Sequence, residues 1–233
     1  MTAIAQTPTN TFTRTENQPV SLFKIGGLAG IIAAFTFLFG FALFVTTFEP
    51  LTTGELNSVE TVEFLRDNQT TFYVWNLVIY VLFGIMQAVL TLAMVERLKS
   101  IAPGIAQIAA ALGLIWSGLV IASGMVANVG ATAVIDLYAT DPTQAGTVWT
   151  TIDSVYKGIG GGNEIVGGLW VLLVSLAALR GGLPKALNLA GLLVGAAGII
   201  TLVPPLADMG AIFGLGIIAW YIWTGVVLVR SKS

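Results

Sequence analysis

The chain has 233 residues, of which 56% are hydrophobic and only 9% are charged, and its net charge is −2. A soluble domain carries about 25% charged residues, so this chain has too few to cover a globular surface in water. It contains no cysteine and no histidine, which excludes disulfides, thiolate or imidazole catalysis and most zinc and copper sites. We therefore expect an all-α protein that lies in a lipid bilayer, without a metal or a cofactor. Its few scattered basic residues do not suggest nucleic acid as a partner.

Residues 1–20 are polar and rich in threonine, which predicts a disordered tail in front of a membrane domain of residues 21–233. A helix that crosses a bilayer needs about 20 predominantly apolar residues. Six segments meet this requirement, at about residues 22–48, 72–96, 104–130, 156–179, 186–204 and 210–229. The sequence thus predicts a polytopic membrane protein with six transmembrane helices.

The charged residues predict the orientation of these helices, because cytoplasmic connections carry an excess of lysine and arginine. With six crossings, eight basic residues fall on one side of the membrane: Arg14, Lys24, Arg97, Lys99, Arg180, Lys185, Arg230 and Lys232. Most of the acidic residues fall on the opposite side. We expect both termini, and with them the N-terminal tail, to be cytoplasmic in a multi-pass protein of the cell membrane.

The connections on the outer side are longer than the cytoplasmic ones and carry helix signals. Asn57 followed by Glu60 resembles a capping box, and apolar residues recur at helical spacing from Val59 to Leu65. This pattern predicts a short amphipathic helix at about residues 55–68 on the outer surface.

Asp141 and Pro142 are typical of a helix cap followed by a proline at the first helical position. A helix from Pro142 to Leu179 would be about 57 Å long, and the third helix is too long in the same way, whereas a bilayer with its headgroups is about 40–45 Å thick. We expect the third and fourth helices to project beyond the outer surface and to meet at a turn of residues 139–141. The alternative is that the fourth helix breaks at its glycines.

The fourth helix carries charged residues in an apolar setting. Asp153, Lys157 and Glu164 are spaced four and seven residues apart and therefore share one helical face. Asp153 and Lys157 suit an ion pair at the membrane interface. An acid at the depth of Glu164 costs about 2.5–3.5 kcal/mol to insert, so it should face the bundle interior, a wet cavity or a partner.

The second helix carries a polar stripe of Asn76, Tyr80, Gln87 and Thr91, whose positions lie within about 60° of one another on a helix. Such a stripe either forms hydrogen bonds between helices or lines a polar cavity. The residues that we expect to form a ligand-binding pocket open to the outside are Glu164, Asn163, Lys157, Asn76, Tyr80 and Asn128, with Gln87 placed deeper.

Small residues recur four apart in every predicted helix except the second, as in Gly26/Gly30 and Gly191/Gly195. In a membrane this pattern lets helix backbones approach closely. We expect it to serve tight packing within the bundle, and an exposed glycine face would suit a homo-oligomer or another membrane protein. Trp75 and Trp149 suit the aromatic belt at the outer membrane interface.

The segment Gly-Asn-Glu-Ile-Val-Gly-Gly-Leu-Trp at 162–170, with Ala-Leu-Asn-Leu-Ala-Gly at 186–191 and Asp-Pro at 141–142, resembles a family of small six-helix bacterial integral membrane proteins of unknown function. The resemblance implies a six-helix fold in a bacterial inner membrane. It supplies no catalytic residue.

Two functions follow from these patterns. The first is binding or transport of a small solute or ion through a polar pocket in the outer half of the bundle. The second is a role as an accessory or structural subunit of a larger membrane complex, docked through the glycine faces and Glu164. An enzyme acting on lipid is a third reading, but the sequence shows no pair of a nucleophile and a base.

Overall fold

The structure, a computed structural model, describes residues 21–161, 164–206 and 208–231, and the regular elements within these ranges are all helical, as predicted. The α-helices are α1 (Leu22–Leu43), α2 (Ser58–Asp67), α3 (Gln69–Asn76), α4 (Phe83–Leu98), α5 (Pro103–Tyr138), α6 (Pro142–Tyr156), α7 (Ile165–Ala178), α8 (Lys185–Ile200) and α9 (Met209–Arg230). Shorter turns are π-helical at Phe44–Phe48, Leu77–Leu82 and Lys157–Gly161, and 3-10 at Glu49–Leu51 and Pro204–Leu206. The predicted tail of residues 1–20 lies outside the described residues.

Five helical segments within the described ranges are long and apolar enough to cross a membrane: Leu22–Leu51, Gln69–Leu98, Pro103–Tyr138, Pro142–Ala178 and Met209–Arg230. They fit the predicted class of membrane-embedded, all-α proteins. The remaining predicted segment, residues 186–204, forms the shorter helix α8 of 16 residues. At 1.5 Å per residue α8 is about 24 Å long, less than a hydrocarbon core of about 30 Å. A sixth crossing therefore stays a prediction.

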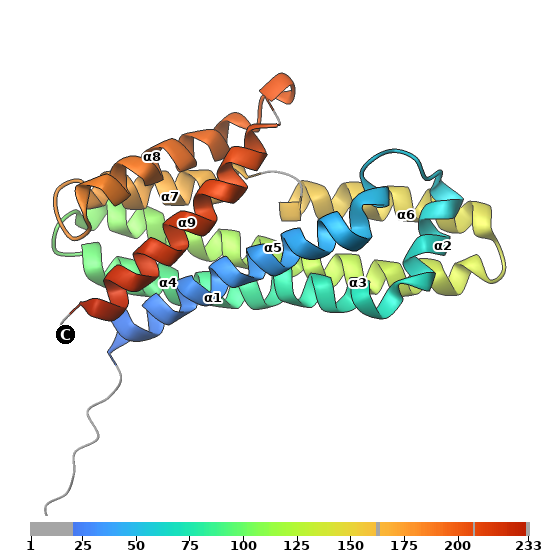
Figure 1. Cartoon of the computed structure of the whole chain (residues 1–233), viewed down its shortest axis with the longest axis horizontal. Helices are drawn as coiled ribbons and strands as arrows, with labels where there is room; N and C mark the ends of the chain where they lie inside the picture. The colour runs from blue at the N-terminus through green and yellow to red at the C-terminus, as the bar shows by residue number, and fades with distance from the viewer. Residues whose placement is uncertain (1–20, 162–163, 207, 232–233) are drawn as a thin grey trace, which may run out of the picture.

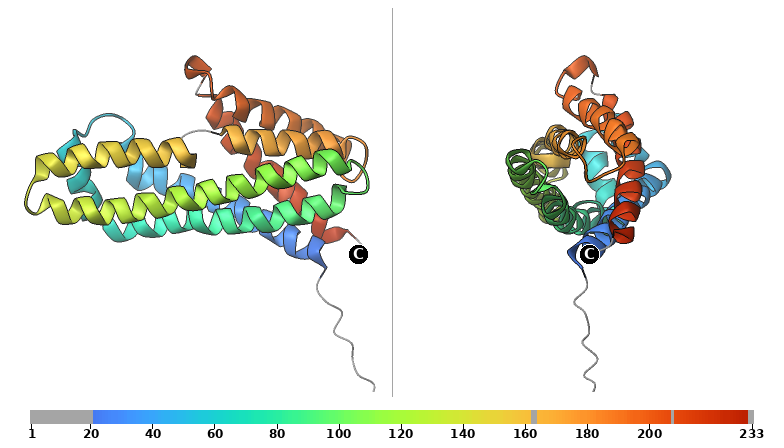
Figure 2. Two further views of the ribbon diagram at one scale, coloured as in Figure 1. Left: turned by 180° about the vertical axis from the view of Figure 1, so that it is seen from behind. Right: turned by 90° about the vertical axis from the view of Figure 1, so that its left-hand side faces the viewer.

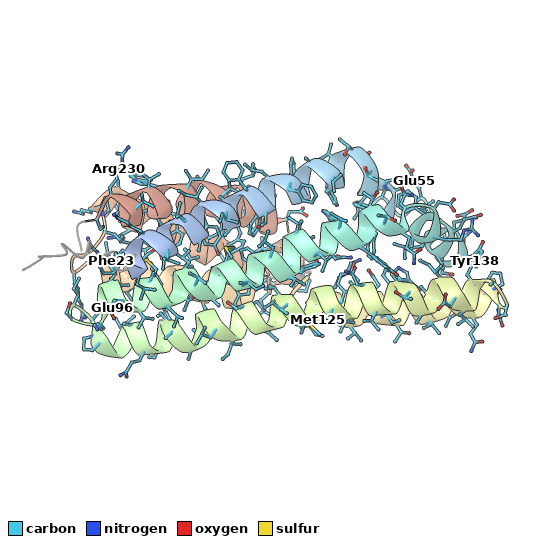
Figure 3. The ribbon with its side chains drawn as sticks, turned by 90° about the horizontal axis from the view of Figure 1, so that it is seen from below. Phe23, Glu55, Glu96, Met125, Tyr138 and Arg230 are labelled. Carbon is cyan, nitrogen blue, oxygen red and sulfur yellow. The ribbon has the colours of Figure 1, made fainter. Side chains whose placement is uncertain are left out.

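The molecule is an elongated bundle, and α1 begins at the same end at which α9 finishes (Figure 1). The α4–α5 and α7–α8 turns lie at that end as well. Figure 3 shows Phe23, Glu96 and Arg230 at this end and Glu55 and Tyr138 at the opposite one. The chain therefore runs back and forth along the long axis, as successive crossings of a membrane require.

Contacts at this end join segments that are distant in the sequence. The Nε of Arg97 donates a hydrogen bond of 3.0 Å to the carbonyl of Gly182 in the α7–α8 turn, and the guanidinium lies 5.6 Å from the ring centroid of Phe23 in α1. We call it the basic end, because six basic residues lie on the segments that meet there: Lys24, Arg97, Lys99, Arg180, Lys185 and Arg230.

At the opposite end, α5 and α6 form a long hairpin (Figure 2). Helix α5 has 36 residues and is about 54 Å long, well beyond the thickness of a hydrocarbon core. The two helices meet at residues 139–141, as predicted, and the Asp141 side chain caps α6 by accepting a 2.9 Å hydrogen bond from the backbone N–H of Gln144. We call α2, α3, α6 and the C-terminal half of α5 the hairpin end.

Helix α2 confirms the predicted short amphipathic helix. The Asn57 side chain accepts hydrogen bonds from the backbone N–H groups of Val59 and Glu60, at 2.9 and 3.0 Å, and the Glu60 carboxylate accepts one from the Asn57 backbone at 2.8 Å. This is the expected capping box. The apolar face, with Val62 and Leu65 fully buried, packs against α5 and α6.

The fourth predicted helix also breaks, which was the alternative expectation. Helix α6 ends at Tyr156, Gly160 departs from helical geometry with φ 178° and ψ 4°, and α7 begins only at Ile165. Both helices pack in succession along α5. Because of this break, α7 is a separate helix, and Glu164 lies immediately before its first turn.

Several glycines serve close helix packing inside the chain. A Cβ atom on Gly27 of α1 would lie 2.6 Å from the carbonyl oxygen of Gly225 in α9, and a Cβ on Gly225 would lie equally close to that of Gly27. Gly168 of α7 and Gly195 of α8 oppose each other in the same way, at 2.7 Å. These pairs confirm that small residues bring backbones together here. Gly214 of α9 has no such neighbour, since a Cβ there would meet no atom within 4 Å.

The buried side chains form two clusters along the bundle. One fills the half toward the basic end and includes Phe83, Trp116 and Trp170. The other fills the hairpin end and includes Phe48 and Trp149. Tyr80 packs against both clusters and so marks the boundary between them.

Candidate functional site

A cavity of about 580 Å³ lies at the boundary of the two cores, with α1 on one side and α6 on the other. Its walls come from the C-terminal half of α1 and the turns that follow it, the start of α2, α3 and the start of α4, the middle of α5, and α6 onward to Glu164. The volume falls within the range of about 300–1,000 Å³ that is typical of small-molecule sites.

The exposure of the lining residues shows where the cavity opens. Phe83, Trp116 and Val120 are buried and form its floor. The exposed lining residues, which form its mouth, are Phe41, Thr52, Ser58, Thr150 and Lys157. The mouth therefore lies on the flank of the bundle, between the end of α1 and α6.

Aromatic side chains make up much of the wall: Phe37, Phe41, Phe44, Phe48, Trp75, Tyr80, Phe83, Trp116, Trp149 and Tyr156. They hold one another in place through ring contacts. Phe83 packs edge-on against Phe37 and Trp116, with ring centroids 5.1 and 5.3 Å apart, and Phe48 lies 4.6 Å from Trp75. Rings fixed in this way present stable faces and edges to whatever occupies the cavity.

Two π-helical turns and the kinked turn at Lys157–Gly161 border the cavity. They contribute Phe44 and Phe48, Ile79 and Tyr80, and Lys157 and Gly160 to its lining. A π-helical turn widens the helix and re-aims the side chains around it, and such turns occur frequently at functional sites.

Two of the three charged lining residues neutralise each other. The Nζ of Lys157 lies 2.7 Å from the Oδ2 of Asp153, one helical turn away, and both side chains are partly exposed at the mouth. This is the ion pair that the sequence predicts, and its place at a membrane interface stays a prediction. Because opposite charges lie in contact, the pair adds little net charge to the cavity.

Glu164 is the third charged lining residue, and it is half-buried. Among the described residues, no hydrogen bond or ion pair engages its carboxyl group. It stands at the N-terminus of α7, where the partial positive charge of the helix dipole offsets part of the cost of a carboxylate in this position. The cavity therefore contains one acid that no basic group of the described chain neutralises.

The seven predicted site residues divide into three groups. Glu164, Lys157 and Tyr80 line the cavity. Asn163 lies outside the described residues. The cavity is not lined by Asn76, Asn128 or Gln87, which form hydrogen bonds elsewhere. Both alternatives for the polar stripe of the second helix therefore apply: Tyr80 lines a cavity, whereas Asn76 and Gln87 form hydrogen bonds.

The three remaining polar residues link helices. The Nδ2 of Asn76 donates to the Oδ1 of Asn128 at 3.0 Å, which joins α3 to α5. The fully buried Gln87 donates to the Oγ1 of Thr91 at 3.1 Å and accepts from the Tyr221 hydroxyl at 2.6 Å, which joins α4 to α9. Both polar atoms of the Gln87 side-chain amide therefore have a hydrogen-bond partner.

Replacing Tyr221 with phenylalanine should reduce the free energy of unfolding by about 1–2 kcal/mol, because the buried Oε1 of Gln87 loses its donor. The measurement is denaturant unfolding of the purified protein in detergent. The matched control is Tyr80→Phe, since the Tyr80 hydroxyl makes no hydrogen bond to a described residue, and we expect a change below about 0.5 kcal/mol. Equal losses in the two variants would contradict the role assigned to the Gln87–Tyr221 bond.

The sequence analysis missed the aromatic wall. Trp75 and Trp149, which we expect in the aromatic belt at the outer membrane interface, line the cavity, and the Nε1 of Trp75 donates to the carbonyl of Gly40 at 3.1 Å. A signal was present, because the cavity-lining aromatic residues of the first predicted helix recur at helical spacing: Phe37, Phe41, Phe44 and Phe48. In a helix that is apolar on every side, however, such a stripe does not stand out.

The chain is not significantly similar to any protein-family model, curated protein or solved structure. Its function must therefore follow from the geometry of the cavity.

Proposed function

We propose that this protein is a multi-pass membrane protein that binds a small solute in the cavity between α1 and α6, as a receptor or as a carrier across the membrane. The observation that carries this proposal is a cavity of about 580 Å³, walled by aromatic rings in contact with one another and holding an acid that has no basic partner among the described residues. Small-molecule sites typically combine such an apolar lining with few polar groups.

The orientation that we propose places the basic end in the cytoplasm, with six crossings and both termini inside. The positive-inside rule supports it, since six basic residues lie on the segments that meet at this end. In this arrangement α8 supplies the sixth crossing despite its length, so that α9 can return to the basic end. The resemblance to small bacterial membrane proteins favours a bacterial inner membrane.

This orientation places the cavity in the outer half of the membrane. The 14 residues of α7 separate Glu164 from the basic end by about 21 Å, and Trp116 is reached after about 20 Å of α5. In a hydrocarbon core of about 30 Å both residues lie beyond the midplane. The mouth then faces the outer leaflet and the outer surface.

A role as a docked subunit has less support. Glu164 borders an internal cavity and not an outer face, and the glycines Gly27, Gly168, Gly195 and Gly225 oppose one another inside the chain. These four glycines are therefore not available to a partner, whereas Gly214 of α9 remains open.

The test is to block the mouth. In Thr150→Trp, an indole replaces a small exposed side chain at the mouth and should exclude a ligand. We expect a thermal-shift screen of drug-sized amphipathic compounds to find ligands that raise the melting temperature of the natural protein by about 5–10 °C at a concentration of about 100 Kd. The same ligands should leave Thr150→Trp unshifted.

Thr151→Trp is the matched control, because Thr151 is equally exposed on the same helix but does not line the cavity. It should respond to ligands as the natural protein does. If every stabilising ligand shifts both tryptophan variants equally, or if none is found, the proposal fails.

A further inference from the structure

We infer that the cavity binds an organic cation, meaning an ammonium or similar group on an apolar body, with the positive charge placed between Glu164 and the aromatic floor. This inference rests on the proposed function and names the chemical class of its ligand.

The balance of charge around the cavity favours a cation. Among the charged or ionisable residues that the described chain contributes to the lining, Asp153 is paired with Lys157 at 2.7 Å, so the acid without a basic partner is Glu164. An organic cation stabilises the ionised form of this acid, whereas an anionic ligand would be repelled by that form and a neutral apolar ligand would leave it without a counter-charge in surroundings of reduced polarity.

The aromatic floor strengthens the preference. A Cβ on Gly167 would lie 2.5 Å from the Cζ2 of Trp116, so the indole of Trp116 packs on the first turn of α7. Gly167 follows Glu164 by three residues, and positions three apart share a helix face. Glu164 and Trp116 both line the cavity, so a cation that contacts the carboxylate lies on the side of the cavity that also carries this indole, and an indole attracts positive charge.

The lining also indicates that the cation is organic and not a bare metal ion. Calcium and magnesium need six or more oxygen ligands, and within the described ranges no group of three or more acidic, histidine or cysteine residues could hold a metal ion. The cavity instead offers ring surface over a volume of about 580 Å³, which suits the apolar body of a drug-sized molecule.

Two probes of equal shape and opposite charge provide the test: tetraphenylphosphonium, a cation, and tetraphenylborate, an anion. Their affinities for the purified full chain in a non-ionic detergent are measured by isothermal titration calorimetry. We expect Glu164→Gln to weaken tetraphenylphosphonium binding by about tenfold or more, because a charge interaction is lost, and to leave tetraphenylborate binding unchanged or tighter. Comparing variants for each probe separately cancels its partition into the micelle.

Glu96→Gln is the matched control. It removes the same charge from an exposed acid of α4 that is paired with Lys99 at 2.8 Å, far from the cavity at the basic end (Figure 3). Neither affinity should change by more than about twofold in this variant, since surface ion pairs contribute little.

The possible results separate the inference from the proposed function. If Glu164→Gln changes the two affinities alike, the assignment of a cation is overturned, while a loss of binding in Thr150→Trp would still support the cavity as a binding site. If Thr150→Trp changes the affinity of neither probe, the cavity itself is not the binding site, and both the inference and the proposed function fail.

The ammonium group can belong to a soluble amine or to a lipid headgroup, and competition distinguishes the two sources. Displacement of tetraphenylphosphonium by tetrabutylammonium but not by dihexanoylphosphatidylcholine indicates a soluble cation. The reverse pattern indicates a choline-type headgroup that enters through the mouth on the flank of the bundle. Displacement by neither compound would contradict the inference.

Discussion

Replacing Gly195 with valine should destabilise the protein by about 3 kcal/mol or more and should prevent much of it from folding. A Cβ at this position would lie 2.7 Å from the carbonyl oxygen of Gly168 and 2.8 Å from the backbone nitrogen of Leu172, both in α7. Backbone atoms within a helix cannot move aside as a flexible side chain can. The helices α7 and α8 would have to separate, and packing is what holds helices together in a membrane.

The effect is measured as the fraction of monodisperse protein after detergent extraction and as the melting temperature of that fraction. Gly214→Val is the matched control, since it makes the same change in α9 at a position where a Cβ meets no atom within 4 Å. We expect it to change stability by less than about 0.5 kcal/mol. A fully stable Gly195→Val protein would mean that α7 and α8 do not approach as closely as described.

Two single-cysteine variants should differ completely in maleimide labelling of intact cells, because we expect their thiols to lie on opposite sides of the membrane. The natural chain has no cysteine, so a thiol reagent has no background target. Thr140→Cys places a thiol in the exposed α5–α6 turn at the hairpin end, and Ser100→Cys places one in the exposed α4–α5 turn at the basic end. An impermeant maleimide applied to intact cells should label position 140 and should label position 100 only after permeabilisation, because the basic end is cytoplasmic in our proposal.

Labelling of both positions in permeabilised cells controls for the reactivity of each thiol. The reverse pattern in intact cells would invert the topology and would turn the mouth of the cavity toward the cytoplasm. The binding experiments would still apply in that case, but the ligand would reach the cavity from inside the cell.

The position of the cavity gives the helix break a structural role. At Gly160 the helical course that begins with α6 stops, and α7 resumes after it along the same face of α5. An unbroken helix would keep Glu164 on the same continuous face as Asp153 and Lys157. The break instead sets Glu164 at the start of a new helix, where the dipole of α7 stabilises its charge and where it borders the cavity.

Local patterns were sufficient to predict the features that depend on neighbouring residues. The capping box of α2, the Asp141 cap, the turn at residues 139–141 and the pair of Asp153 with Lys157 all lie within a few residues of chain, so their chemistry can be read directly. The all-α class follows from composition, because a chain with 9% charged residues suits lipid, where a long apolar segment satisfies its own backbone hydrogen bonds by forming a helix.

The cavity could not be read in this way, because it depends on which faces of distant helices meet. In a bilayer the apolar side chains that face lipid look like those that face the core, so hydrophobic periodicity loses its power to identify the interior. Polarity and helical position therefore group Asn76 and Gln87 with Glu164, whereas packing assigns them to hydrogen bonds with Asn128 and Tyr221. Composition and local spacing are enough to predict the class, the caps and an acid that is costly to insert, whereas the packing of distant helices brings this acid to the border of an aromatic cavity.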